Sequence, residues 1–173
     1  MNRISDATTE LLRATGQTQP PVDLTVITDY LDLTVVKTNM SNDVSGMLIR
    51  DGASGANTVG LNNAHNLGRR RFTLAHEIGH FHLHRGRPLI VDSSVRINLR
   101  DRTSGMATDR EEMEANRFAA ELLMPSEVVL DAVAAAKMTD ADQLTHHLAT
   151  RFKVSQQAMG YRLINLGILS SPS

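Results

Sequence analysis

Apolar positions follow two different periods in the first part of the chain. Helical spacing predicts helices over about residues 4–15 and 24–31, and the adjacent prolines of QPPVD separate them because proline cannot continue a helix. A β-branched run predicts a strand over 33–38, and two apolar runs near 46–50 and 57–62 predict a hairpin around a Gly- and Asn-rich turn. These segments predict a small antiparallel sheet of about three strands.

Helical spacing dominates the rest of the chain. A helix is predicted from about residue 66 to 84, and Gly86 and Pro88 end it. The polar stretch 92–109 has no periodicity and is predicted to be a surface loop. The fold class is therefore α+β, with residues 1–125 as a first domain and 126–173 as a helical subdomain. Further helices are predicted over about 110–125, 126–137, 140–151 and 155–166.

Composition and charge narrow the classes of function. The chain of 173 residues has no cysteine and a net charge of −1. Disulfide-stapled secreted domains, thiolate ligands and cysteine nucleophiles are therefore excluded. The charge gives no reason to expect binding to nucleic acid or to a membrane surface. The N-terminus lacks the apolar stretch of a signal peptide, and no segment is apolar enough to span a membrane. We therefore expect a soluble cytoplasmic protein.

One segment, RRRFTLAHEIGHFHLHRG at 69–86, carries residue types that bind metal. His76 and His80 are four residues apart and share one face of the predicted helix, so both imidazoles can reach one Zn²⁺ ion. Glu77 follows the first histidine and can take a proton from a water whose pKa the metal lowers to about 7. The HExxH pattern thus predicts His76 and His80 as metal ligands and Glu77 as general base. Gly79 costs the helix about 1 kcal/mol relative to alanine, which predicts a close neighbour at that point.

A histidine-rich amphipathic helix without a metal is the alternative interpretation, because the apolar residues of this segment also form a packing face. His82 points away from the histidine pair and is expected at the surface. His84 lies one turn beyond His80, where it can contact a metal ligand from behind or cap the helix. It is not expected to bind the metal directly.

The third ligand is expected on the predicted helix 110–125, because a catalytic zinc usually has three protein ligands and one open position. Phe118 marks the buried face of this helix. Glu114 lies four residues before Phe118 and Glu111 lies seven before it, so both are placed near that face. Glu112 is placed on the solvent side. Zinc is the expected ion, with Mn²⁺ or another divalent metal as the alternative.

Several motifs together resemble one known family. RRRFTLAHEIGH and EANRFAAELLMP, with an upstream PPVDL and a GLNN strand, resemble the ImmA/IrrE metallopeptidases over most of residues 15–170. The resemblance implies a zincin-like catalytic domain in which Glu77 is the catalytic glutamate. It implies that the zinc is held by His76, His80 and Glu114.

The resemblance also implies a substrate and a role. Members cleave DNA-bound repressors of the helix-turn-helix type, and so relieve repression of mobile-element or stress-response genes. The chain resembles the short form, without the C-terminal sensor-like domain of longer members. Glu111 stays the alternative third ligand. The metzincin pattern HExxHxxGxxH is excluded, because residue 83 is Leu and residue 86 is Gly.

The C-terminal segment 148–169 has the spacing of a helix-turn-helix, with Ser155 as an N-cap of its second helix. Gln156 and Gln157 would then face a DNA major groove. The segment offers few cations for phosphates, so direct DNA binding is not expected and a helical subdomain packed on the peptidase is preferred. Docking of the substrate repressor is a further possibility. The cations are Arg151, Lys153 and Arg162.

Three hypotheses follow. The first is a zinc-dependent endopeptidase that acts on a protein substrate, expected to be a helix-turn-helix repressor. The second is a zinc-containing binding module that captures a repressor or antitoxin without cleaving it, which would need a closed site with four ligands. The third is a DNA-binding regulator with a vestigial peptidase. Candidates for stabilising an oxyanion are Tyr161, His84 and His147, and no membrane partner is expected.

Overall fold

The computed structural model describes residues 3–86, 88–93 and 108–170. The chain forms two compact units, one comprising Leu24–Ala119 and the other comprising Met1–Asp23 with Ala120–Ser173. The domain boundary expected after residue 125 stays a prediction. Most of the loop expected at 92–109 lies outside the described residues. No helix among the described residues is long and apolar enough to cross a membrane.

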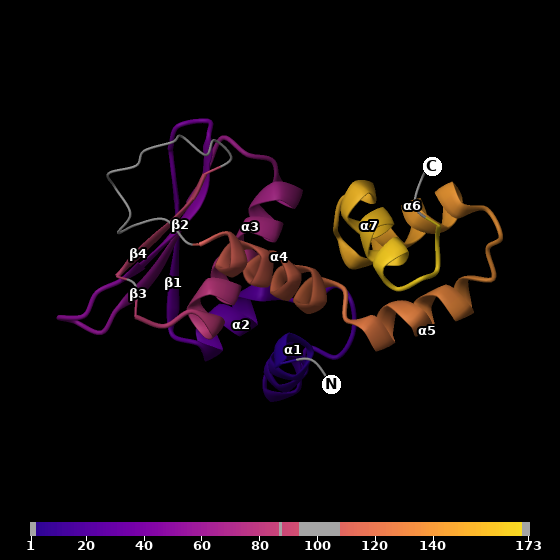
Figure 1. The fold of residues 1–173 in the computed structure, drawn as a ribbon, viewed down its shortest axis with the longest axis horizontal. Coiled ribbons are helices and arrows are strands. Elements are labelled where there is room, and N and C mark those ends of the chain that lie inside the picture. Colours follow the sequence, from indigo (N-terminus) through magenta and orange to yellow (C-terminus); the bar gives the residue numbers. More distant parts are fainter. Residues whose placement is uncertain (1–2, 87, 94–107, 171–173) are drawn as a thin grey trace. The chain divides into compact units, whose positions relative to one another are not determined.

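The unit Leu24–Ala119 contains a sheet and the helices next to it (Figure 1). All of its elements but one were predicted to within about two residues, a normal uncertainty for element ends. The unpredicted element is the short strand β4. In chain order the elements are α2 (Leu24–Tyr30), β1 (Leu33–Thr38), β2 (Val44–Arg50), β3 (Asn57–Asn62), α3 (Leu67–Leu83), β4 (Leu89–Ser93) and the first part of α4 (Asp109–Leu123).

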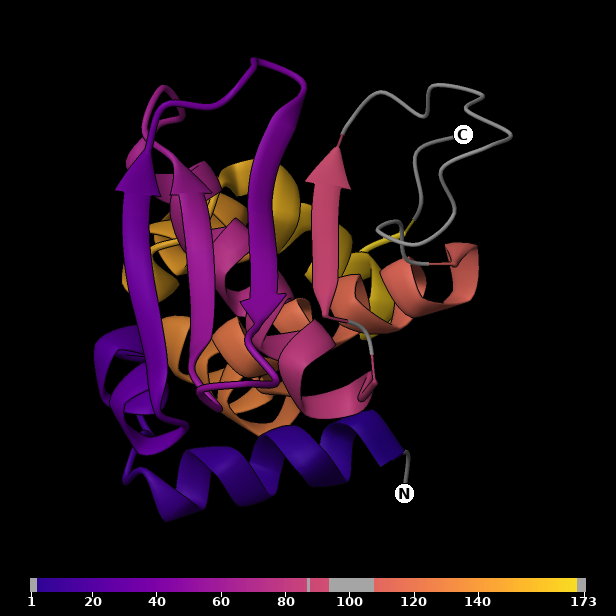
Figure 2. The same ribbon diagram turned by 90° about the vertical axis from the view of Figure 1, so that its left-hand side faces the viewer.

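The sheet has four strands in the order β1-β3-β2-β4 (Figure 2). Strand β2 is antiparallel to β3, as the predicted hairpin requires, and is also antiparallel to β4. Strand β1, however, pairs in parallel with β3. The expectation of an antiparallel sheet of about three strands is therefore corrected to a mixed sheet of four. Periodicity along a strand shows which face is buried, but it does not show which neighbour the strand pairs with.

The placement of β1 depends on the connection between β1 and β2, which crosses the end of β3. Asn62, the last residue of β3, is fully buried, and its Nδ2 donates to the carbonyl oxygens of Ser41 and Val44 at 3.0 and 2.8 Å. The buried amide thereby satisfies backbone groups of the connection that would otherwise lack partners. Asn62 belongs to the predicted GLNN strand, but these contacts of its side chain were not predicted.

Helix α3 packs on β2 and β3 (Figure 1). It begins at the N-cap Asn66, whose side chain accepts a hydrogen bond from the backbone N–H of Arg69 at 2.8 Å. Its end is capped from the sheet, because Nη2 of Arg50 on β2 donates to the carbonyl oxygens of His80 and His84 at 2.9 and 2.8 Å. The helix is therefore held at both ends. The core between it and the sheet includes Leu48, Val59, Ile78 and Ile90.

The second unit is helical. Its core contains the fully buried residues Leu148, Phe152, Met159 and Leu163. The predicted helix-turn-helix spacing is present, with Ser155 accepting a hydrogen bond from the backbone N–H of Ala158 at the start of the last helix. The helices are α1 (Arg3–Ala14), the end of α4, α5 (Ser126–Ala136), α6 (Ala141–Phe152) and α7 (Gln156–Asn165).

One cation of this unit is buried in a polar cluster. Arg162 on α7 pairs with the Glu121 carboxylate, and its Nε donates to the carbonyl oxygen of Met124 at 2.9 Å. Its Nη2 also donates to Ser126 Oγ at 2.9 Å. Arg162 therefore has a structural partner for its charge and is not presented to a ligand at the surface, which leaves Arg151 and Lys153 of the cations expected on this segment.

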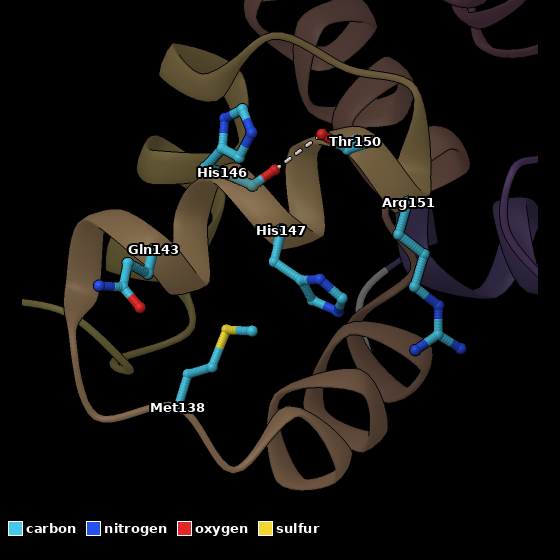
Figure 3. Close-up of a pocket in the computed structure, with 6 residues that line it drawn as sticks. All are labelled: Met138, Gln143, His146, His147, Thr150 and Arg151. Atoms are coloured by element: carbon cyan, nitrogen blue, oxygen red, sulfur yellow. Dashed lines mark hydrogen bonds between the residues drawn. The ribbon is translucent and has the colours of Figure 1, made fainter.

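A surface hollow of about 510 Å³ lies along α6 (Figure 3). His147 and Met138 project toward it, and Thr150 Oγ1 donates along the helix to the His146 carbonyl oxygen at 3.0 Å (Figure 3). The hollow is open and its lining is mostly carbon. The residues that line it are Met138, Gln143, His146, His147, Thr150 and Arg151.

Candidate metal centre

Helix α3 brings His76 and His80 together as the HExxH spacing predicts. Both side chains are buried, and their Nε2 atoms lie 3.0 Å apart. The rings meet edge to face, with centroids separated by 4.6 Å. Both Nε2 atoms therefore point toward the same small volume, one helical turn apart.

The carboxylate beside the two histidines is that of Glu112. Its Oε2 lies 3.2 Å from His76 Nε2, and its Oε1 lies 3.4 Å from His80 Nε2. His76, His80 and Glu112 are the group of metal-ligating residue types that converges among the described residues. Glu112 was expected on the solvent side, and this expectation is wrong.

The structure also corrects the placement of the other two glutamates. Glu114, expected with the histidine pair, instead lies against His84, with Oε2 at 3.0 Å from His84 Nε2. Glu111, the alternative, forms a capping box at the start of α4. Its carboxylate accepts from the backbone N–H of Thr108 at 2.7 Å, and its own N–H donates to the Thr108 hydroxyl at 3.3 Å. The capping pattern Thr-x-x-Glu at 108–111 was readable in the sequence and was missed.

The reason for the difference is the helix face that meets α3. The prediction oriented α4 by Phe118 alone, but Ala115 approaches Gly79 of α3 just as closely. A Cβ atom built on Gly79 would lie 3.2 Å from the Cα atom of Ala115 and 3.2 Å from Phe118 Cβ. Glu112 lies one turn before Ala115 on the same side of the helix. The contact also confirms the close neighbour predicted for Gly79.

The electrostatics of the cluster favour an ionised Glu112 carboxylate and a neutral His80 ring. Burial raises the pKa of Glu112, but hydrogen bonds and charge interactions with His76 and His80 outweigh it and lower that pKa to about 2. Burial lowers the pKa of His80 below its usual value, against the opposing effect of Glu112. An ionised carboxylate beside a neutral imidazole is the form in which both act as ligands.

The donor atoms fit a small divalent cation. Zinc binds imidazole nitrogen and carboxylate oxygen at about 2.0–2.2 Å, so tetrahedral ligand atoms are separated by roughly 3.3 Å. The separations here are 3.0, 3.2 and 3.4 Å. Three protein ligands leave one coordination position open, as in catalytic zinc sites. The same donor set also accepts Mn²⁺ and other divalent metals.

Glu77, the predicted base, is fully buried on α3. Its carboxylate has room because the neighbouring position on β2 is a glycine. A Cβ atom at Gly46 would lie 3.0 Å from Glu77 Oε1 and 2.5 Å from Thr73 Cγ2, a distance that would force a shift. Sequence reasoning did not single out Gly46, although a glycine inside a strand often marks such a close approach.

The Nδ1 atoms of both histidines have partners on the side away from the cluster. His76 Nδ1 lies 3.0 Å from Asn116 Oδ1, and His80 Nδ1 lies 3.0 Å from His84 Nδ1. His84 therefore contacts His80 on the side that faces away from the cluster, which is one of the two roles expected for it. His82 is half-buried rather than at the surface, with its ring centroid 5.8 Å from that of Phe118.

Of the three oxyanion candidates, His84 belongs to the unit that holds the cluster. His84 approaches the Nδ1 side of His80 and not the Nε2 side. Tyr161 and His147 belong to the other unit, where both are exposed.

The chain matches a known protein family over most of its length. A family model described as the IrrE N-terminal-like domain, Peptidase M78, matches residues 28–164. The chain belongs to this family. The match confirms the ImmA/IrrE resemblance, and it covers the HExxH helix, Glu112 and most of the C-terminal helices.

A phage protein is also similar. The "Uncharacterized immunity region protein 2" of Bacillus phage phi105 is 30% identical to this M78 family member over 106 residues. The matched segment spans 60% of this chain and 59% of the phage protein.

Proposed function

We propose that this M78 family member is a zinc-dependent endopeptidase whose metal ligands are His76, His80 and Glu112. The observation that carries the proposal is the convergence of two buried imidazoles and one ionised carboxylate, with the HExxH glutamate fully buried on the same helix. A divalent metal bound there supplies a Lewis acid and lowers the pKa of water.

Glu77 is proposed as the general base. Its carboxylate accepts a proton from the water that attacks the peptide carbonyl carbon, and it then delivers that proton to the leaving amine nitrogen. The peptide C–N bond breaks, and the water oxygen stays on the new carboxyl group. His76, His80 and Glu112 hold the metal and do not exchange protons in this scheme.

The proposed substrate is a helix-turn-helix repressor. Two observations support it: membership of the M78 family, and the name of the phage relative, which refers to an immunity region. A role in relieving repression of mobile-element or stress-response genes is consistent with both. A physiological metal other than zinc is compatible with the same ligands.

The alternative is a zinc-containing module that captures a repressor or antitoxin without cleaving it. A structural zinc is normally closed by four protein ligands. The cluster has three among the described residues, which favours the peptidase. Direct DNA binding stays outside the proposal, because Arg162 is engaged with Glu121 and the remaining cations of 148–169 are few.

The test compares wild type with Glu77→Gln. The substrates are purified helix-turn-helix repressors whose genes lie near the gene of this protein, and mass spectrometry detects cleavage. We expect one metal per chain in both, with cleavage lost by at least about 10²-fold in the variant, a typical contribution of a general base. Glu10→Gln, at an exposed position on α1, is the matched control. Repressor binding without cleavage in every protein would support the capture module instead.

A further inference from the structure

We propose that Asn116 and His84 are positioning residues that fix the tautomers of His76 and His80, and that Glu114 acts through His84. The inference rests on the proposed metal site and assigns a role to the outer contacts of that site. It also gives Glu114 a function other than that of a direct ligand.

The direction of each hydrogen bond on the His80 side follows from the Glu114 carboxylate. Ionised Glu114 only accepts, so His84 Nε2, at 3.0 Å, carries the proton and donates it. The other nitrogen of a neutral His84 ring is then an acceptor. His80 Nδ1, at 3.0 Å from His84 Nδ1, must therefore carry a proton, which leaves the lone pair of His80 Nε2 directed into the cluster.

Asn116 has the equivalent effect on the other histidine. Its Oδ1, 3.0 Å from His76 Nδ1, is an acceptor only, so His76 Nδ1 is the protonated nitrogen. The lone pair of His76 Nε2 then points into the cluster as well. Two such lone pairs at 3.0 Å repel each other unless a metal ion lies between them or, without the metal, a proton on one of these nitrogens is donated to Glu112. The outer contacts thus select the tautomers that suit a metal.

Helix α4 provides the whole set of carboxylate and amide partners. Glu112 approaches the Nε2 atoms directly, while Glu114 and Asn116 act on the Nδ1 side of the rings. Glu114 is in turn held by Arg110, one turn earlier, whose Nε donates to Glu114 Oε1 at 2.9 Å. Helix α4 therefore supplies one ligand and also the groups that orient the other two. Histidine ligands of metals are commonly oriented by such outer hydrogen bonds.

The experiment measures zinc affinity by competition with a chromogenic chelator in wild type, His84→Ala and Asn116→Ala. We expect each variant to keep one zinc per chain with an affinity lower by about 10- to 100-fold, the usual effect of removing such a partner. His82→Ala, on the same helix but with its ring against Phe118, is the matched control and should change affinity little. Thermal unfolding of the metal-free proteins checks that each variant is folded.

Conservative variants separate positioning from general damage to the fold. Asn116→Asp keeps an acceptor for His76 Nδ1–H, and His84→Gln can accept from His80 and donate to Glu114, so both should restore most of the affinity. Nitrogen-15 NMR of the histidine rings in the metal-free protein gives a second readout. We expect His76 and His80 to be protonated at Nδ1 in wild type, and a mixture of tautomers for His80 in His84→Ala.

The outcomes are distinguishable. A wild type that binds one zinc, with unchanged affinities and tautomers in His84→Ala and Asn116→Ala, would overturn this inference and leave the proposed peptidase standing. A wild type that binds no metal would overturn both. Failure of Asn116→Asp and His84→Gln to recover affinity, in folded proteins, would also count against positioning.

Discussion

The two units each contain a polar cluster built around a partly buried glutamate of α4, and the clusters differ in the groups that pair with that glutamate. Glu121 is paired with the guanidinium of Arg162, and backbone and hydroxyl groups satisfy the remaining donors. Glu112 meets two imidazole nitrogens, which are metal ligands as readily as hydrogen-bond donors. The first cluster carries its own cation and is structural. The second has the composition of a metal site.

The distinction shows how to interpret buried charge in this fold. A buried ion pair is weak evidence for function, because its charges balance within the protein. A half-buried carboxylate beside two buried histidines, whose Nδ1 atoms are hydrogen-bonded on the side away from it, is a stronger indication, because the arrangement directs lone pairs toward one point. Substitutions in the two clusters should therefore have different effects.

The largest expected effect is the loss of metal from Glu112→Ala. Removing one of three ligands should reduce the zinc content from one per chain to near zero, whereas Glu114→Ala should keep one zinc with weaker binding. Metal analysis by mass spectrometry measures both, with Glu111→Ala as a control because Glu111 belongs to the capping box. If Glu112→Ala kept its zinc and Glu114→Ala lost it, the ligands would instead be His76, His80 and Glu114, as the family resemblance implied.

Substitutions in the Glu121 cluster should change the stability of the protein and not its metal binding. Arg162→Ala leaves a buried carboxylate without its cation, which should lower the free energy of unfolding by about 3 kcal/mol. Urea denaturation measures this change. Arg151→Ala, at an exposed position on α6, should cost less than about 0.5 kcal/mol. Equal and small effects of both substitutions would show that the buried pair contributes no more than a surface charge.

The smallest expected effect is that of Gly79→Ala, which tests the helix contact that orients Glu112. The added Cβ would lie 3.2 Å from the backbone of Ala115, so we expect overpacking of about 1–3 kcal/mol, partly offset by about 1 kcal/mol of helix propensity. Zinc affinity should fall with stability, because α4 must shift.

Gly68→Ala on the same helix is the control for this substitution. A Cβ there meets only Asn66 Oδ1, at 3.6 Å. This substitution should be neutral or slightly stabilising. If Gly79→Ala behaved in the same way in both stability and affinity, the close approach of the two helices would not be what places Glu112.

The sequence by itself determined most of the elements and two of the three residues of the candidate metal site. Apolar periodicity located the helices and three of the four strands, because the side that is buried repeats every 3.6 or 2 residues. The HExxH spacing placed His76 and His80 on one helix face without reference to any other element. The family resemblance, confirmed by the match over 28–164, followed from contiguous motifs.

Only the tertiary structure decided which glutamate joins the histidines and how the strands pair. Successive helix residues are separated by about 100° around the axis, so the choice between Glu112 and Glu114 depends on which side of α4 meets α3. That side is set by the contact of Gly79 with Ala115, two residues that are distant in the chain. The parallel pairing of β1 with β3, and the Asn62 contacts beside it, depend in the same way on long-range neighbours that local periodicity does not encode.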